Sequence, residues 1–269
     1  MAYFRRYYYE EKNKYTLITG ASSGIGYESA KLFASKGKNL IIVARTKNNL
    51  IELKTEILKE NPSLDIIIKN TDLSVVKNVY ELYNSLKDYN IETLINNAGF
   101  GNYDNVVTQN LNKIETMLDL NVKAVTILSS LFVHDYKDVE GTTLINISSA
   151  GGYTLVPNAV TYCASKFFVS AFTEGLSHEL ISSNAKLQAK VLAPAATKTN
   201  FGNVANNISN YDYDKSFGNY HTSREMAEFL FDLYTSKSIV GLIDRDTFKF
   251  KLSPPIFPNS YNSTHNQNL

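Results

Sequence analysis

Five tyrosines in this sequence stand four residues before a lysine, namely Tyr8, Tyr27, Tyr83, Tyr162 and Tyr211. On a helix, residues four apart share a face, so each lysine could approach the phenol. A phenol has an ordinary pKa near 10, and a lysine ammonium about 4 Å away supplies roughly the 4 kcal/mol needed to bring that pKa toward neutrality. The spacing indicates proton transfer, but it does not by itself select one pair.

Position selects Tyr162 and Lys166. This pair follows the fifth expected strand, and Ser149 comes soon after the same strand. In an open α/β sheet the ligand lies beyond the carboxyl ends of the strands, so these side chains are expected to share one site. The pairs that begin with Tyr27 and Tyr83 are interpreted as surface pairs on helices.

A glycine-rich turn, TGASSGIG, runs from Thr19 to Gly26 between an apolar strand and a helical pattern. Gly20 permits a tight turn, Gly24 lets the backbone approach a pyrophosphate, and Gly26 lets the helix pack against the sheet. Free amides at the helix N-terminus would face the phosphates. Taken alone, the turn could also be an ordinary loop. The predicted contacts to a dinucleotide here are Gly20, Ser22, Ser23, Gly24, Ile25 and Gly26.

The elements that position these residues alternate between short apolar runs and longer helical patterns. Strands are expected over 15–19, 39–44, 64–69, 93–95, 142–147, 187–192 and 239–243, and helices over 25–35, 50–59, 75–86, 111–134, 161–181 and 223–235. Continuous apolar strands are typical of parallel sheets covered on both faces. We therefore predict one α/β domain with a Rossmann-like, doubly wound parallel sheet of about seven strands and helices on both faces.

The predicted boundaries are an N-terminal extension over 1–14, a dinucleotide-binding and catalytic domain over 15–243, and a C-terminal tail over 244–269. The stretch 198–220 is long and rich in Asn, Tyr and Gly, which predicts a lid over the substrate.

Composition narrows the class of partner. The chain has 27 Lys and Arg against 26 Asp and Glu, so we expect neither a nucleic acid nor an anionic membrane as partner. Its apolar runs are shorter than the roughly 18 residues of a membrane span, and charges crowd the N-terminus where a signal peptide would be apolar. The single cysteine, Cys163, fits a reducing compartment and a packing role, so a cytoplasmic location is expected. The four histidines show no metal-ligand spacing, so no metal is expected.

The motifs and their order resemble the short-chain dehydrogenase/reductase family over roughly residues 15–243. Three residues separate the first two glycines of the turn, and the further marks are NNAG at 96–99, Asn121, Ser149, the Tyr162 pair and 194–199. This resemblance implies an oxidoreductase that moves a hydride between nicotinamide and a small-molecule carbonyl or alcohol.

The resemblance also implies the catalytic roles. Tyr162 would be the general acid and base, Ser149 would hold the substrate oxygen, Lys166 would lower the pKa of the phenol and bind the ribose, and Asn121 would support a relay water. Ser148 is a rival to Ser149, and the family's spacing selects Ser149. The alternatives are that Ser149 caps a turn and that Asn121 binds backbone.

The cofactor is expected to be NADP(H) in preference to NAD(H). The family's acidic position after the second strand falls on Ala44, and Arg45 follows it, a side chain suited to the 2′-phosphate. A solvated charge at a strand end is the alternative for Arg45. The remaining contacts implied for the cofactor are Asp72, Leu73, Asn97, Ala98, Gly99, Tyr162, Lys166, Pro194, Thr197 and Thr199.

The sequence departs from the family at two places. Ala195 replaces a usual glycine, so the backbone near the nicotinamide is expected to be slightly more constrained, with cofactor binding retained. The ending over 244–258 is atypical, which favours a homodimer and puts a tetramer in doubt. Aromatic and apolar candidates for a substrate pocket, each also explicable as packing, are Phe100, Tyr153, Leu155, Tyr211 and Tyr213. Alternative functions are a non-catalytic NADP-binding sensor, disfavoured by the complete catalytic set, and a sugar-nucleotide epimerase or dehydratase, disfavoured by the glycine spacing and the short region after residue 200.

Overall fold

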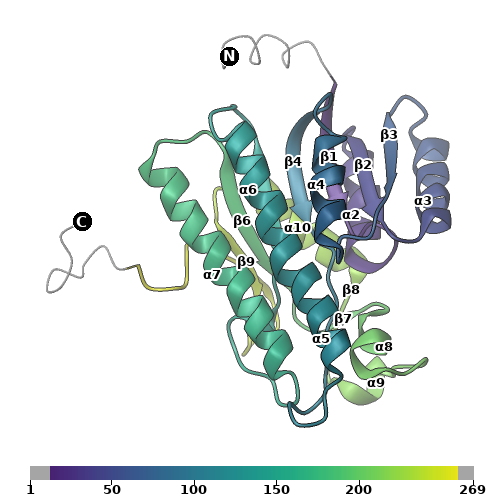
Figure 1. Ribbon diagram of the computed structural model, residues 1–269, viewed down its shortest axis with the longest axis vertical. Coiled ribbons are helices and arrows are strands. Elements are labelled where there is room, and N and C mark those ends of the chain that lie inside the picture. The colour runs from purple at the N-terminus through teal and green to yellow at the C-terminus, as the bar shows by residue number, and fades with distance from the viewer. Residues whose placement is uncertain (1–12, 260–269) are drawn as a thin grey trace, which may run out of the picture.

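The computed structural model describes residues 13–259 and is built around one twisted sheet (Figure 1). The sheet has eight strands in the order β10-β9-β6-β5-β4-β1-β2-β3. All neighbours are parallel except β10 and β9. The strands are β1 (Lys14–Thr19), β2 (Asn39–Ala44), β3 (Ile66–Asn70), β4 (Asn90–Asn96), β5 (Thr143–Ile147), β6 (Gln188–Ala193), β9 (Val240–Ile243) and β10 (Phe250–Ser253). A separate parallel pair joins β7 (Thr197–Lys198) to β8 (His221–Thr222).

Helices cover both faces of the sheet. One apolar cluster packs α4, α6 and α7 against one face, and a second packs α2, α3 and α10 against the other. The helices are α2 (Gly24–Ser35), α3 (Lys47–Glu60), α4 (Val76–Asn84), α5 (Leu111–Leu118), α6 (Val125–Tyr136), α7 (Val160–Ser182), α8 (Phe201–Asn206), α9 (Tyr213–Ser216) and α10 (Ser223–Thr235). The expected Rossmann-like α/β fold is confirmed.

The structure adds elements that the sequence pattern did not predict. Residues 250–253, assigned to the tail, form the antiparallel edge strand β10. The expected helix over 111–134 contains a π-helical turn, η1 (Asp119–Ala124), and the irregular stretch 198–220 contains α8 and α9.

The interpretation of Tyr83 as a surface residue is wrong. Its side chain is buried, and its hydroxyl donates to the Leu131 carbonyl at 2.9 Å, because α4 turns this face toward α6. Tyr8 lies outside the described residues.

The helical run Leu111–Tyr136 is long and apolar enough to cross a membrane by length and composition. In this fold it lies against the sheet, where Leu128 and Phe132 of α6 are fully buried in the core. Its apolar character is therefore used in packing.

The strand order creates the place for a site. The chain winds from β1 outward through β2 to β3, then returns to β4 on the other side of β1. Connections that leave neighbouring strands in opposite directions open a crevice at their carboxyl ends. In Figure 1 these ends point down, toward α8 and α9.

Candidate active site

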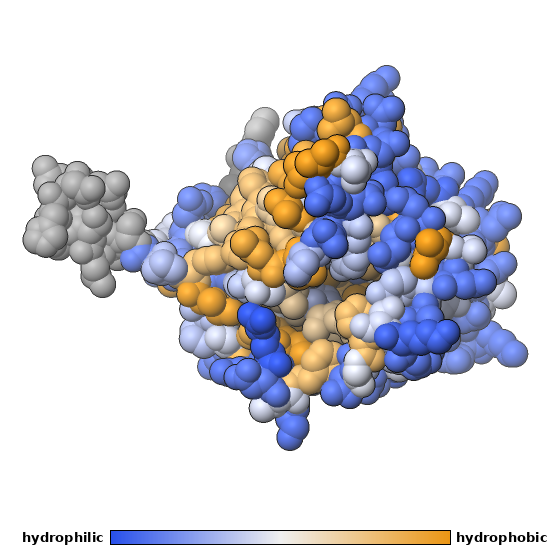
Figure 2. Space-filling view, turned by 90° about the horizontal axis from the view of Figure 1, so that it is seen from below, coloured by the Kyte–Doolittle hydropathy of each residue, from blue (hydrophilic) through white to orange (hydrophobic). Residues whose placement is uncertain are grey.

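A cavity of about 710 Å³ lies beyond the carboxyl ends of the strands. This volume lies within the range typical of ligand pockets. Its lining includes every predicted catalytic and cofactor-binding residue except Gly26 and Asn121, which stand directly behind lining residues. Figure 2 looks onto this face, where apolar side chains gather around a hollow.

The glycine-rich turn has no room for side chains. Gly20 and Gly24 have positive φ values of 68° and 58°, which glycine adopts without strain. A Cβ on Gly26 would collide with the Gly20 carbonyl oxygen and with Asn97 Nδ2. Ser23, the N-cap of α2, makes no side-chain cap hydrogen bond, so the first amides of the helix are open to an anionic ligand. The turn therefore fits a pyrophosphate.

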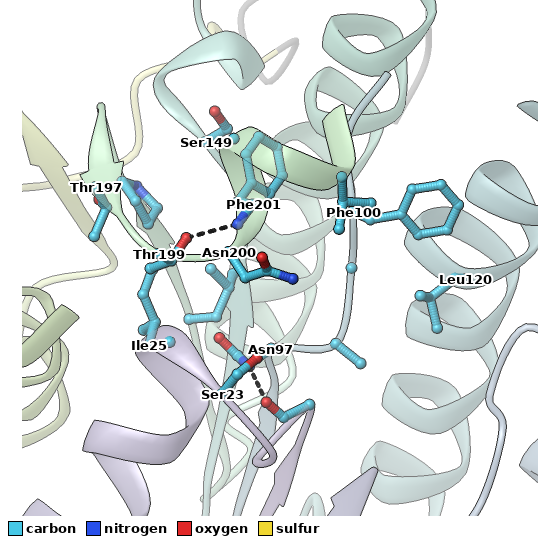
Figure 3. A pocket seen from close by; sticks show the side chains of 18 of the residues that line it. Ser23, Ile25, Asn97, Phe100, Leu120, Ser149, Thr197, Thr199, Asn200 and Phe201 are labelled. Atoms are coloured by element: carbon cyan, nitrogen blue, oxygen red, sulfur yellow. Dashed lines mark hydrogen bonds between the residues drawn. The ribbon is translucent and has the colours of Figure 1, made fainter. Parts of the chain in front are cut away.

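Asn97 braces this turn from the neighbouring strand. Its Nδ2 donates to the carbonyls of Thr19 and Gly20 at 3.0 and 3.2 Å, and Thr19 Oγ1 accepts from the amides of Asn97 and Ala98 at 3.0 Å each. Thr199 closes the other side, since a Cβ on Gly24 would lie 3.1 Å from its methyl group. Figure 3 shows Asn97, Ser23 and Thr199 around the start of α2.

The end of the cavity beside β2 and β3 carries one basic and one acidic side chain, Arg45 and Asp72. Arg45 is exposed at the end of β2, and its backbone carbonyl is held by Asn70 Nδ2 at 2.8 Å. Asp72, after β3, accepts from the amide of Ser74 at 3.0 Å. Because Ala44 has no carboxylate, the guanidinium is the charged group that β2 contributes to the lining.

Tyr162 and Lys166 both lie in the first two turns of α7 and are almost fully buried. Lys166 Nζ donates to the Ile147 carbonyl at 2.9 Å and lies 6.0 Å from the centroid of the Tyr162 ring. Burial lowers the pKa of Lys166 to about 8. Burial also raises the pKa of Tyr162, an effect opposed by a hydrogen bond with Ser149.

The raised pKa of Tyr162 runs against the expectation from sequence, in which Lys166 lowers it. The physical reason is that both groups are withdrawn from water, and the Lys166 ammonium is directed to a backbone carbonyl on β5.

Ser149 caps a turn and Asn121 binds backbone, as the alternatives to their catalytic roles predicted. Both residues still border the site. Ser149 Oγ accepts from the Gly151 amide at 3.0 Å as the cap of a short 3₁₀ turn. Asn121 lies in the π-helical turn, where its Nδ2 donates to the Phe100 carbonyl at 2.9 Å and its Oδ1 accepts from the Phe100 amide at 3.2 Å. Ser148 uses its hydroxyl to donate to the Lys166 carbonyl at 2.9 Å. Ser149 is therefore the serine whose hydroxyl contacts Tyr162.

Two residues next to Tyr162, Tyr103 and Phe201, are not among the predicted site residues. The Tyr103 and Phe201 rings lie 6.0 and 5.5 Å from the Tyr162 ring, centroid to centroid. In Figure 3 the Phe201 ring is directed toward Ser149. The sequence feature that could have indicated them is that both are aromatic residues in segments that follow strands ending at the site. Of the earlier pocket candidates, Phe100, Tyr211 and Tyr213 line the cavity, whereas Tyr153 and Leu155 are not among its lining residues.

Comparison with known proteins settles the family. The family model described as short chain dehydrogenase matches residues 14–208. The chain belongs to the short-chain dehydrogenase family. It is accordingly an oxidoreductase that acts on CH–OH or C=O groups with a nicotinamide dinucleotide.

Relatives of this short-chain dehydrogenase include dehydrogenase/reductase SDR family member 11 from Homo sapiens, 29% identical over 71% of this chain and 75% of the relative. A short-chain dehydrogenase from Sphingobium yanoikuyae, in complex with NADPH, is 29% identical with a TM-score of 0.76, over 87% of this chain and 89% of the other. The bulky-bulky ketone specific alcohol dehydrogenase from Comamonas testosteroni is 29% identical with a TM-score of 0.74, over 85% of each chain.

Proposed function

We propose that this protein is an NADPH-dependent carbonyl reductase in which Tyr162 donates the proton. The observation that carries the proposal is one continuous cavity that joins the glycine-rich turn to Ser149, Tyr162 and Lys166. Binding of the dinucleotide along the turn would bring its nicotinamide to Tyr162 and Lys166. When bound, the cofactor supplies a hydride to the carbonyl carbon of the substrate.

The side chains of the protein provide the remaining chemistry. Ser149 holds the carbonyl oxygen by a hydrogen bond, and Tyr162 gives its hydroxyl proton to the oxygen as negative charge develops there. The ammonium of Lys166 stabilises the phenolate that remains, and its second role is to bind the ribose. Asn121 holds the Phe100 backbone beside Lys166 and supports the path by which the phenolate regains a proton.

Preference for NADPH is attributed to Arg45. Its guanidinium can bind the 2′-phosphate through two parallel hydrogen bonds, and Ala44 leaves no carboxylate to bind a free ribose hydroxyl. A similar short-chain dehydrogenase, 29% identical, is known in complex with NADPH, which supports this assignment.

The location, the oligomeric state, the domain boundaries and the substrate class are also proposals. We propose a cytoplasmic homodimer in which 15–243 forms the catalytic domain, 198–220 covers the substrate, 1–14 is an extension and 244–269 is a tail whose strand β10 completes the sheet. The substrate is a neutral ketone or aldehyde, or the matching alcohol, and not a nucleic acid or a membrane. A 29% identical alcohol dehydrogenase that is specific for bulky-bulky ketones supports this class.

The direct test is to mix the purified protein with NADPH or NADH and a panel of neutral aldehydes and ketones, and to follow nicotinamide absorbance. We expect substrate-dependent oxidation of NADPH, with the alcohol as product. Tight cofactor binding without turnover of any carbonyl or alcohol would instead indicate a sensor. Sedimentation velocity on the same sample would test the dimer.

A further inference from the structure

The substrate end of the cavity is walled by aromatic rings. Tyr103 lies in the loop after β4 and Phe201 begins α8, and their centroids are 6.2 Å apart at an interplanar angle of 69°. Both rings pack against Tyr162. The lining contains further aromatic residues, Phe100, Tyr211, Tyr213 and Phe217. Aromatic walls of this kind favour a flat or bulky apolar group by edge and face contacts.

Charges are confined to the other parts of the cavity. Among the lining residues of the described chain, the charged side chains are Arg45, Asp72 and Lys166. The first two follow β2 and β3, on the side of the glycine-rich turn, and Lys166 stands behind Tyr162. No acid or base at the aromatic end could pair with a charged substrate, so a charged group would be desolvated there without compensation.

The hydroxyls of Tyr103 and Tyr211 in this aromatic wall make no hydrogen bond to any residue within 13–259, and of these two rings it is the Tyr103 ring that packs against Tyr162. Burial raises the pKa of Tyr103 to about 12. It therefore stays protonated, and it can donate a hydrogen bond, throughout the physiological pH range. The Tyr103 amide donates to the Ala205 carbonyl of α8 at 2.9 Å, which joins this loop to α8.

We propose that Tyr103 is a specificity-determining residue whose hydroxyl donates a hydrogen bond to a second oxygen of a neutral, ring-bearing carbonyl substrate. The inference rests on the proposed function, in which Ser149 and Tyr162 bind the oxygen that reacts. A donor in a largely apolar wall is costly to leave unpaired when a ligand excludes water. A substrate with a second oxygen satisfies the Tyr103 hydroxyl, whereas an analogue without that oxygen does not.

The test compares two neutral aryl ketones, methyl benzoylformate, which carries a second oxygen function beside the ketone, and acetophenone, which does not. kcat/KM with NADPH is measured in the wild type, in Tyr103→Phe and in the control Tyr80→Phe. Tyr80 is an exposed tyrosine on α4 and is not among the lining residues of the cavity. The keto ester is the more reactive ketone in any enzyme, so the deciding quantity is how each substitution changes the ratio of the two kcat/KM values.

We expect Tyr103→Phe to lower kcat/KM for methyl benzoylformate roughly 10-fold, the effect of losing one buried hydrogen bond, and to leave acetophenone within about twofold. Tyr80→Phe should leave the ratio unchanged. Because the hydroxyl has no partner in the described chain, thermal stability and NADPH affinity should also be unchanged. An equal effect on both ketones, no effect on either, or a loss of stability would overturn the inference.

A binding measurement separates this inference from the proposed function. Methyl mandelate and 1-phenylethanol, the alcohols that correspond to the two ketones, are titrated by calorimetry into the complex with NADP⁺. If the wild type turns over no carbonyl, the proposed function fails. Loss of affinity for methyl mandelate alone in Tyr103→Phe would still support recognition by Tyr103, and unchanged affinities would refute it.

Discussion

Tyr162 and Lys166 respond to the same burial with opposite changes in pKa. Withdrawal from water disfavours the charged form of each, so the pKa of the phenol rises and that of the ammonium falls to about 8. The phenol is therefore held in its proton-donating form. Lys166 is the member of the pair that titrates near neutral pH. In the proposed mechanism, the charged form of Lys166 stabilises the phenolate during turnover.

The pH dependence of reduction follows from the lowered pKa of Lys166. Above about pH 8 Lys166 loses its positive charge, so kcat/KM for carbonyl reduction should fall as pH rises through this value. The measurement is the pH profile of kcat/KM with saturating NADPH. In Lys166→Arg the charge persists, so residual activity should show no fall between pH 8 and 10. The same fall near pH 8 in both proteins would assign it to another group.

The expected preference for NADPH depends on a single guanidinium, that of Arg45. Arg45→Ala should weaken NADPH binding by roughly 1.5 to 3 kcal/mol, the range for hydrogen bonds to charged groups, and change NADH binding little. Titration of both cofactors by fluorescence measures this difference. Lys47→Ala, an exposed charge two residues further on, is the control. Equal losses for NADPH and NADH would count against a 2′-phosphate contact.

The packing of helix α2 against strand β1 depends on Gly26. A methyl group there would collide with the Gly20 carbonyl and Asn97 Nδ2, so the turn and the helix would have to separate. Gly26→Ala should therefore lower the free energy of unfolding by about 1 to 3 kcal/mol and weaken cofactor binding at least 10-fold. Urea unfolding and cofactor titration measure the two effects.

Gly175 offers the matched control. It lies within α7 and is exposed, and within residues 13–259 no atom outside its own helical turn lies within 4 Å of the place where a Cβ would be. Gly175→Ala should raise the free energy of unfolding by about 0.5 to 1 kcal/mol, because alanine loses less conformational freedom in a helix. The two substitutions should thus have opposite signs, and a destabilised Gly175→Ala would show that this helix face has an unrecognised contact.

Local patterns predicted most elements, whereas contacts between distant segments could not be read from them. The glycine-rich turn and the strand before it are contiguous, so they were visible in the sequence. The π-helical turn around Asn121 interrupts an otherwise regular apolar pattern without a sequence mark. β10 is short and half exposed, and it exists because a turn closed by Asp244 and Thr247 directs it back along β9.

In the candidate site, too, local motifs were predicted and contacts between distant segments were not. Tyr162 and Ser149 were predicted because motif order places them after one strand. The contacts of Tyr103 with Phe201 join residues nearly a hundred positions apart, and only the folded sheet brings their loops together. The buried position of Tyr83 likewise depends on which face of α4 meets α6, and the amphipathic pattern alone did not settle that.

For the molecule as a whole, the segment 198–220 is tied at both ends and contains two short helices between them. The β7 and β8 strands pair Thr197 with His221 and Lys198 with Thr222, while α8 and α9 between them are only six and four residues long. Short helices have little intrinsic stability. Opening of this segment between fixed ends would admit the substrate, since Phe201 packs on the buried Tyr162.

Hydrogen exchange tests this motion. In the free protein, amides of 198–220 should exchange much faster than those of β4, β5 and β6, and they should slow when NADP⁺ and a product alcohol are bound. The comparison strands in the same sample serve as the internal control. Exchange in 198–220 as slow as in the sheet, without any ligand, would show that the segment is a fixed wall.

The proton transfer assigned to Tyr162 is the central claim, and Tyr162→Phe tests it most directly. The substitution removes one oxygen and keeps the buried ring, so NADPH should still bind nearly normally through the glycine-rich turn and Arg45. Single-turnover reduction of a carbonyl substrate, followed by nicotinamide absorbance, should slow by about 10²- to 10⁴-fold, as expected for loss of a general acid. Tyr80 is an exposed tyrosine on α4, and the control Tyr80→Phe should react at the wild-type rate. A Tyr162→Phe protein that binds NADPH and reduces the substrate as fast as the wild type would contradict the account.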